Sequence, residues 1–139
     1  MIRLIASDID GTLLKTGTTM PDPAYYRVIG QLVEDTRALG PEAECMYCTK
    51  DTAYFSPLDQ SIQKLMTDKF YFHCKTVDKL TDLPFPCIKF SVKIKDELEE
   101  GLRQWFIPKW QKSHEVTRGG NYVSVMQAGV TKGSSIKKI

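Results

Sequence analysis

Two aspartates near the start of the chain have the residue type and the spacing best suited to chemistry. Asp8 and Asp10 stand two residues apart, directly after the largely apolar run Arg3–Ser7, and Gly11 and Thr12 follow them. In an extended segment the side chains of residues i and i+2 point to the same side, so both carboxylates can face one site. Two neighbouring carboxylates repel each other, which favours either a bound Mg²⁺ or a proton on one of them. Either outcome suits phosphoryl transfer.

The elements around this pair support such a site. The run Arg3–Ser7 is typical of a short buried strand, and open α/β sheets bind their ligands at the carboxyl ends of strands. Gly11 permits a sharp turn that brings backbone N–H groups towards an anion. The sequence therefore predicts an anion site at the end of the first strand.

The segment from Leu4 to Leu14, LIASDIDGTLL, resembles the first motif of the haloacid dehalogenase (HAD) superfamily, in the form seen in Cof-type sugar-phosphate phosphatases. The resemblance implies that Asp8 is the nucleophile that forms an aspartyl-phosphate. It also implies that Asp10 is the general acid and then the base for water. It further implies a Mg²⁺ cofactor held by Asp8 and Asp10, and a small phosphorylated metabolite as the substrate.

A second segment near the other end extends the resemblance. Residues 128–136, AGVTKGSSI, resemble the third motif of the family, whose lysine, here Lys132, neutralises the phosphate. At the start of a helix, Lys132 would also have the amide groups of the helix N-terminus beside it. Together with Gly11 and Thr12, Lys132 completes the expected phosphate-binding set.

The resemblance implies an α/β fold with a partial HAD-like, Rossmann-type core and an α/β cap domain that makes up most of the chain. Residues 1–40 would be the N-terminal core fragment, residues 41–128 the cap, and residues 129–139 the return to the core. Apolar periodicity and turn residues predict the elements between the two motifs. These are helices at 23–39, from Ser56-Pro57 onwards and from Asp96 to Pro108, strands at 43–49 and 87–94, and a hairpin of 115–118 with 122–127.

Some of these elements carry finer expectations. Leu58 is placed on the apolar side of the second helix, and Asp96 with Glu99 forms a capping-box pair at the start of the third. The strand at 87–94 alternates apolar residues with a lysine-rich outer face that includes Lys89 and Ser91. For residues 69–86 the sequence does not decide between a helix and a strand.

The chain also departs from the family pattern. Thr49 could be proposed for the Ser or Thr of the second motif, but the stretch around it reads better as cap, and no acidic fourth motif follows Lys132. Two function classes therefore stay open. One is a Mg²⁺-dependent HAD-like phosphohydrolase, and the other is a truncated or internally deleted, catalytically inactive binding module of the cap type. A second copy of the chain that supplied missing core strands would make a homo-oligomer.

Composition and charge exclude some other classes of function. The net charge is +2 over 139 residues, with five basic and nine acidic side chains in residues 1–60 and the basic excess in the second half. The lysine face, together with Trp105, Phe106 and Trp110, could suggest nucleic-acid binding. However, the apolar spacing of the helix places Trp105 and Phe106 on its buried side, so we expect no nucleic-acid partner. Cys45 and Cys48, three apart on a strand, would face opposite sides, which disfavours a zinc site. No secretory or membrane segment is visible, so we expect a cytoplasmic protein with no membrane partner.

Overall fold

The computed structural model describes residues 23–84 and 87–127, which form an α/β fold built on one sheet. The strands are β1 (Glu44–Cys48), β2 (Ala53–Phe55), β3 (Cys74–Thr76), β4 (Lys89–Lys93), β5 (His114–Gly119) and β6 (Tyr122–Gln127). The helices are α1 (Pro23–Leu39), α2 (Gln60–Asp68), the short turn η1 (Leu80–Asp82) and a run of four pieces, η2 (Asp96–Leu98), α3 (Glu99–Gly101), η3 (Leu102–Phe106) and α4 (Ile107–Gln111). None of the described helices is long and apolar enough to cross a membrane.

The six strands lie in the order β3-β2-β1-β4-β6-β5. The β2–β3 pair is parallel, and every other neighbouring pair is antiparallel. In the middle of the sheet, Met46 of β1 stands opposite Ser91 of β4, which in turn stands opposite Ser124 of β6. Residues aligned in this way point to the same face of a sheet, so these three side chains share one face.

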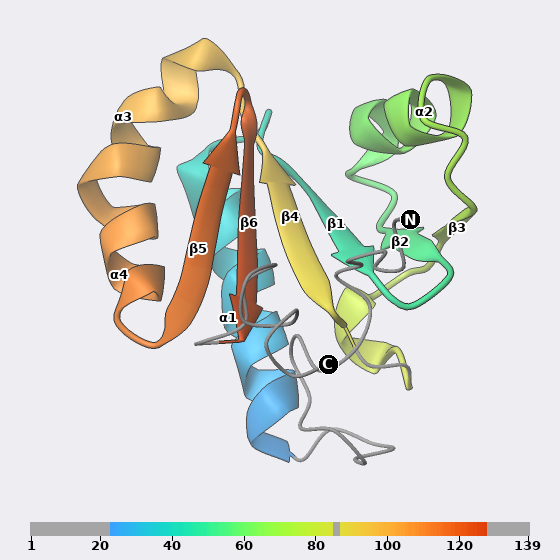
Figure 1. The fold of residues 1–139 in the computed structure, drawn as a ribbon, viewed down its shortest axis with the longest axis horizontal. Coiled ribbons are helices and arrows are strands. Elements are labelled where there is room, and N and C mark those ends of the chain that lie inside the picture. The colour runs from blue at the N-terminus through green and yellow to red at the C-terminus, as the bar shows by residue number, and fades with distance from the viewer. Residues whose placement is uncertain (1–22, 85–86, 128–139) are drawn as a thin grey trace, which may run out of the picture.

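One face of the sheet carries the larger core. Figure 1 shows α1 passing behind the strands and the run from α3 to α4 beside β5. The apolar stripe of α1, with Ile29 and Leu32, packs against sheet residues such as Phe90, which is fully buried. Burial of one such side chain contributes about 1.5–3 kcal/mol to folding. Helix α1 therefore shares a core with the strands, whereas the division into domains at residue 40 stays a prediction.

The opposite face carries a smaller core at one end only. Helix α2 places Ile62 and Met66 against Met46 and Phe55 of the sheet. Its first turn is held by Glu44 of β1, because the backbone N–H of Ile62 donates to the Glu44 carboxylate at 2.7 Å.

A buried ion pair joins α1, β1 and the chain that leads into α2. Asp59 is fully buried, and both of its carboxylate oxygens accept a hydrogen bond from the Arg37 guanidinium at 2.8 Å. The same carboxylate accepts from the Ser56 hydroxyl at 2.6 Å and from the Cys45 backbone N–H at 2.9 Å. Burial alone would raise the pKa of Asp59, but these bonds together hold it below its ordinary value. The cluster of Arg37, Cys45, Ser56 and Asp59 is called the Asp59 cluster below.

Most predicted elements are confirmed, but the region around α2 differs from the expectation. Helix α2 begins at Gln60, so Leu58 precedes it, and Leu58 is 70% exposed rather than part of an apolar helix face. Strands β2 and β3 were not predicted. Each has three residues, which is too short for alternation to stand out from a turn.

The helical run after β4 differs from the predicted helix at both of its ends. The run opens as a 3-10 turn that is flanked by Lys95, and Glu99 pairs with Arg103 and Arg118, so the predicted capping pair of Asp96 and Glu99 does not form. The run also continues past Pro108 to Gln111, so the expected stop at this proline is wrong. The preceding segment, η3, is a π-helix, and Pro108 falls in the first turn of the α-helix that follows, where the missing N–H of proline is tolerated.

We predict that Asp59→Asn lowers the free energy of unfolding by about 3 kcal/mol at pH 7, the lower end of the cost of breaking a buried pair, because Arg37 keeps some solvent contact. The folded-state pKa of Asp59 is depressed. Its contribution is therefore present above the unfolded pKa of about 3.9 and is lost as the pH falls through the folded pKa. The difference in the free energy of unfolding between wild type and variant should then become smaller at acid pH. Urea unfolding at pH 7 and pH 3 measures both effects.

Glu42→Gln is the matched control, because Glu42 forms an exposed ion pair with Lys95. Surface pairs of this kind contribute little, so this variant should unfold close to wild type. Equal losses in the two variants, or an Asp59→Asn deficit that persists undiminished in acid, would contradict the role given to the Asp59 cluster.

Candidate binding site

The residues predicted to do chemistry lie outside the part of the chain that the structure describes. This holds for Asp8, Asp10, Gly11, Thr12 and Lys132. Their roles, and the Mg²⁺ site assigned to Asp8 and Asp10, therefore stay predictions. The described residues offer a different feature, a pocket on the face of the sheet opposite α1.

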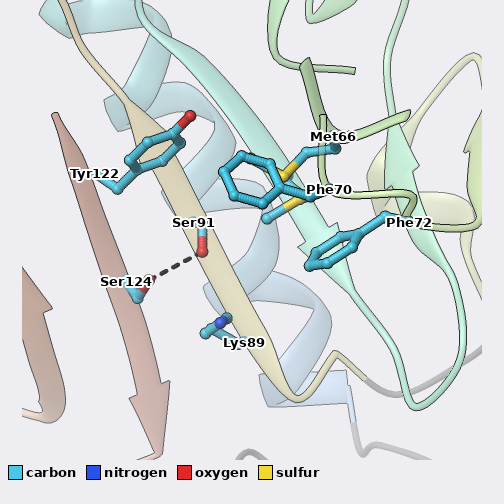
Figure 2. A pocket seen from close by; sticks show the side chains of 8 residues that line it. Met66, Phe70, Phe72, Lys89, Ser91, Tyr122 and Ser124 are labelled. Atoms are coloured by element: carbon cyan, nitrogen blue, oxygen red, sulfur yellow. Dashed lines mark hydrogen bonds between the residues drawn. The ribbon is translucent and has the colours of Figure 1, made fainter. Parts of the chain in front are cut away.

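The pocket has a volume of about 240 Å³ and opens to solvent. Figure 2 shows side chains from the α2 side and from β6 on either side of β4. We call it the sheet pocket, and its lining residues are Met46, Met66, Phe70, Phe72, Lys89, Ser91, Tyr122 and Ser124.

The register of the sheet and the shortness of α2 create this hollow. Met46, Ser91 and Ser124 form the floor, because they lie in one row across β1, β4 and β6. The nine residues of α2 pack on the part of the face formed by β1 and β2. Among the described elements, no helix covers the part formed by β4 and β6, so the pocket opens beside α2.

The loop after α2 supplies one wall of the sheet pocket. Phe70 and Phe72 line it, and their side chains are about half exposed. Tyr71 between them has a φ of 56°, and the Phe72 backbone N–H donates to the Met66 carbonyl at 3.0 Å. A positive φ is uncommon for a bulky residue, and backbone strain of this kind clusters at ligand sites. The turn at Tyr71 thus allows both phenylalanines to reach the same hollow.

Few polar groups enter the pocket. The hydroxyls of Ser91 and Ser124 lie 2.9 Å apart and share one hydrogen bond. Lys89 is half-buried, and within residues 23–84 and 87–127 no carboxylate forms an ion pair with it. Burial, followed by the negative charge of Glu44, raises the pKa of Tyr122, so its hydroxyl stays protonated near neutral pH. The pocket thus combines apolar walls with one cationic group.

The other candidate groups of the described chain do not form a catalytic or metal site. Burial raises the pKa of Cys48 to about 11 and that of Cys45 still further, so both thiols stay protonated. All four cysteines are free, and Cys45 and Cys48 belong to the cores on opposite faces, as predicted. Burial lowers the pKa of His114, which keeps it neutral. Within the described ranges no group of three or more His, Cys, Asp or Glu side chains is arranged so that it could hold a metal ion.

The structure also shows the surroundings of the residues that could have suggested a second HAD motif or nucleic-acid binding. Thr49 stabilises the tight turn between β1 and β2, where its hydroxyl donates to the Thr52 carbonyl at 2.8 Å. Phe106 and Trp110 are buried in the core, so they offer no stacking surface for bases. The Trp110 indole N–H donates to Asp35 of α1 at 3.1 Å, which gives that side chain a structural role.

Sequence reasoning missed the sheet pocket itself. The outer face of β4 was expected to be lysine-rich and solvated, but Ser91 is buried and Lys89 is half-buried. The available signal was a serine at the centre of the lysine face, together with three consecutive aromatic residues from Phe70 to Phe72. Neither signal shows where the two segments meet.

Comparisons with known proteins identify the fold. No protein-family model matches the chain, and no curated protein matches it. A solved structure from Eubacterium rectale is 27% identical with a TM-score of 0.70, and the match covers 90% of this chain and 46% of that one. A haloacid dehalogenase-like hydrolase from Bacteroides thetaiotaomicron is 16% identical with a TM-score of 0.65, covering 91% and 45% of the two chains. A HAD/COF-like hydrolase from Plasmodium vivax is 12% identical with a TM-score of 0.63, covering 89% and 42%.

The chain thus spans less than half the length of these solved structures. The sequence motif around Asp8 and the fold of the described residues point to the same group of proteins. The chain has the fold of the haloacid dehalogenase-like hydrolases, and at the level of the fold the resemblance predicted from its sequence is confirmed.

Proposed function

We propose that this chain is a phosphohydrolase of the HAD type that hydrolyses a small phosphorylated metabolite through Asp8. The observation that carries the proposal is the agreement of two independent features. The DIDGT segment stands ahead of a fold found in HAD-like hydrolases, and the lysine segment stands after it, in the order of the family. A five-residue motif alone is weak evidence, and a matching fold strengthens it.

In the proposed reaction the carboxylate of Asp8 attacks the phosphorus atom, and the bond between phosphorus and the leaving-group oxygen breaks. Asp10 gives its proton to that oxygen, so the alcohol leaves neutral. Asp10 then takes a proton from water, which attacks the phosphorus, releases inorganic phosphate and restores the Asp8 carboxylate. Lys132 neutralises the charge on the phosphoryl oxygens throughout.

Mg²⁺ fits the donors assigned to it. The Asp8 carboxylate and the Asp10 backbone carbonyl are oxygen ligands of the kind that Mg²⁺ prefers, while the described residues add no cluster that would hold a metal elsewhere. When bound, the ion would offset negative charge on the phosphate and the nucleophile.

In this proposal residues 41–128 act as the cap, and the sheet pocket receives the part of the substrate that is not phosphate. A cap of this kind adds binding energy and excludes water from the reacting phosphate.

A second candidate is a binding module of the cap type without catalysis. It is favoured by a fold in which the described residues form their own core and pocket. Such a module would bind a phosphorylated metabolite without turnover.

We predict that the purified chain hydrolyses p-nitrophenyl phosphate in the presence of Mg²⁺, and that Asp8→Asn reduces the rate to background, because an amide is a far weaker nucleophile than a carboxylate. Chelation of the metal should have the same effect. Release of p-nitrophenolate measures the rate. Asp78→Asn, at an exposed position, is the matched control and should keep the wild-type rate. Binding of phosphate compounds without Mg²⁺-dependent turnover would reject the enzyme and leave the binding module.

We also predict that Lys132→Gln lowers kcat/KM for the same substrate by about tenfold or more, because removing one charged donor from a phosphate site costs at least one to two kcal/mol, or roughly tenfold. Inhibition by inorganic phosphate should weaken in parallel. Lys137→Gln, five residues further on, is the control and should behave as wild type. If Lys137→Gln is as damaging as Lys132→Gln, the role assigned to the motif lysine is wrong.

A further inference from the structure

The walls of the sheet pocket are mainly apolar. Met46 and Met66 are buried, and Phe70, Phe72 and the ring of Tyr122 complete the lining. Methionine adapts to the shape of a ligand and makes favourable contacts with aromatic rings, and aromatic side chains stack on flat groups. The pocket therefore favours an occupant with a flat apolar surface.

Because the pocket opens to solvent, its volume limits only the part of an occupant that it covers. A dry cavity of about 150 Å³ holds benzene, and drug-sized ligands occupy about 300–1,000 Å³. The sheet pocket, at about 240 Å³, lies between these sizes. One substituted ring or a fused pair of rings matches it.

The polar groups limit the chemistry further. The Ser91 and Ser124 hydroxyls already satisfy one another in part, at 2.9 Å. Lys89 is half-buried, lines the pocket and has no carboxylate partner among the described residues. A partly exposed cation without such a partner suits an anionic or hydrogen-bond-accepting substituent. A polyhydroxylated ligand would leave several hydroxyls against apolar walls, and each unpaired hydroxyl weakens binding about tenfold.

The rings of Phe70 and Phe72, which form the aromatic wall of the pocket, lie beside one another. The Lys69 ammonium lies 5.9 Å from the centroid of the Phe70 ring, and the Phe70 and Phe72 rings stand 6.4 Å apart at 56°. The positive φ of Tyr71 fixes the turn between the two rings. Strained backbone of this kind clusters at ligand sites, which agrees with a binding role for the two rings.

From these observations we propose that the sheet pocket binds an aromatic or heteroaromatic ring carrying one anionic or hydrogen-bond-accepting substituent beside Lys89. If the chain is the proposed phosphohydrolase, its substrate is then the phosphate monoester of an aromatic alcohol rather than a sugar phosphate. This substrate statement rests on the proposed function, whereas ring binding rests on the pocket alone.

Binding without turnover tests the pocket directly. We use 2-naphthoate as the anionic ring probe, 2-naphthalenemethanol as the neutral ring and D-gluconate as the polyhydroxylated carboxylate, each titrated into the full chain carrying Asp8→Asn. Ligand-observed saturation-transfer NMR reports the dissociation constants. We expect 2-naphthoate to bind with a dissociation constant of about 1 mM, given its size. Gluconate should bind at least tenfold more weakly.

Two matched pairs of variants locate the site. Phe72→Ser should weaken 2-naphthoate at least tenfold, whereas Leu58→Ser, at an exposed apolar residue outside the pocket, should not. Lys89→Gln should weaken 2-naphthoate but not the neutral 2-naphthalenemethanol. Lys93→Gln, on the same strand but outside the lining, should affect neither probe. Thermal unfolding of each variant confirms that it is folded.

Several outcomes would overturn the proposal. These are no binding of either naphthalene probe, gluconate binding as tightly as 2-naphthoate, or equal weakening by Phe72→Ser and Leu58→Ser. Failure of p-nitrophenyl phosphate hydrolysis, with ring binding intact, would reject only the proposed phosphohydrolase. Hydrolysis dependent on Asp8 with no ring binding would reject only the ligand class.

Discussion

The Arg37–Asp59 ion pair is the interaction on which the arrangement of the described chain depends. A buried carboxylate is costly unless charged and hydrogen-bonded partners surround it, and Asp59 has them from α1, from β1 and from the residues ahead of α2. The three segments follow one another along the chain, with Arg37 and Asp59 only 22 residues apart, and they must fold back on one another for these bonds to form. The start of α2 is thereby fixed against the end of α1.

The position of α2 then determines the site. Because Asp59 and Glu44 both hold the beginning of this helix, Met66 reaches the sheet and the following loop carries Phe70 and Phe72 to the edge of the open face. The other face of the same sheet is filled by α1 and by the run that ends at α4. One sheet therefore supplies stability on one side and a pocket on the other. The aromatic wall and Lys89 belong to segments that meet only through this arrangement.

Much of this fold could be predicted from local pattern. The periodicity of α1, the alternation of β4 and the turn between β5 and β6 each identify an element without tertiary information. Strands β2 and β3 could not be found in this way, because three residues carry no measurable period. The end of α4 was missed because proline normally stops a helix, whereas here a π-helical segment precedes Pro108. The sheet pocket could not be predicted either, since it depends on the register of Met46, Ser91 and Ser124 across strands.

The catalytic assignment shows the opposite pattern. Asp8, Asp10 and Lys132 are readable from sequence motifs, and they stay predictions because they lie outside the described residues.

In the proposed function, a cap with a ring-binding pocket serves the nucleophile Asp8, which would form a covalent phosphoryl intermediate. The most direct test is mass spectrometry of the chain after acid quenching of a reaction with an aryl phosphate and Mg²⁺. The account predicts an added phosphoryl group on the peptide that contains Asp8, and its loss in Asp8→Asn. Phosphate release from the aryl phosphate with no such adduct at any quench time, or an adduct that survives in Asp8→Asn, would contradict it.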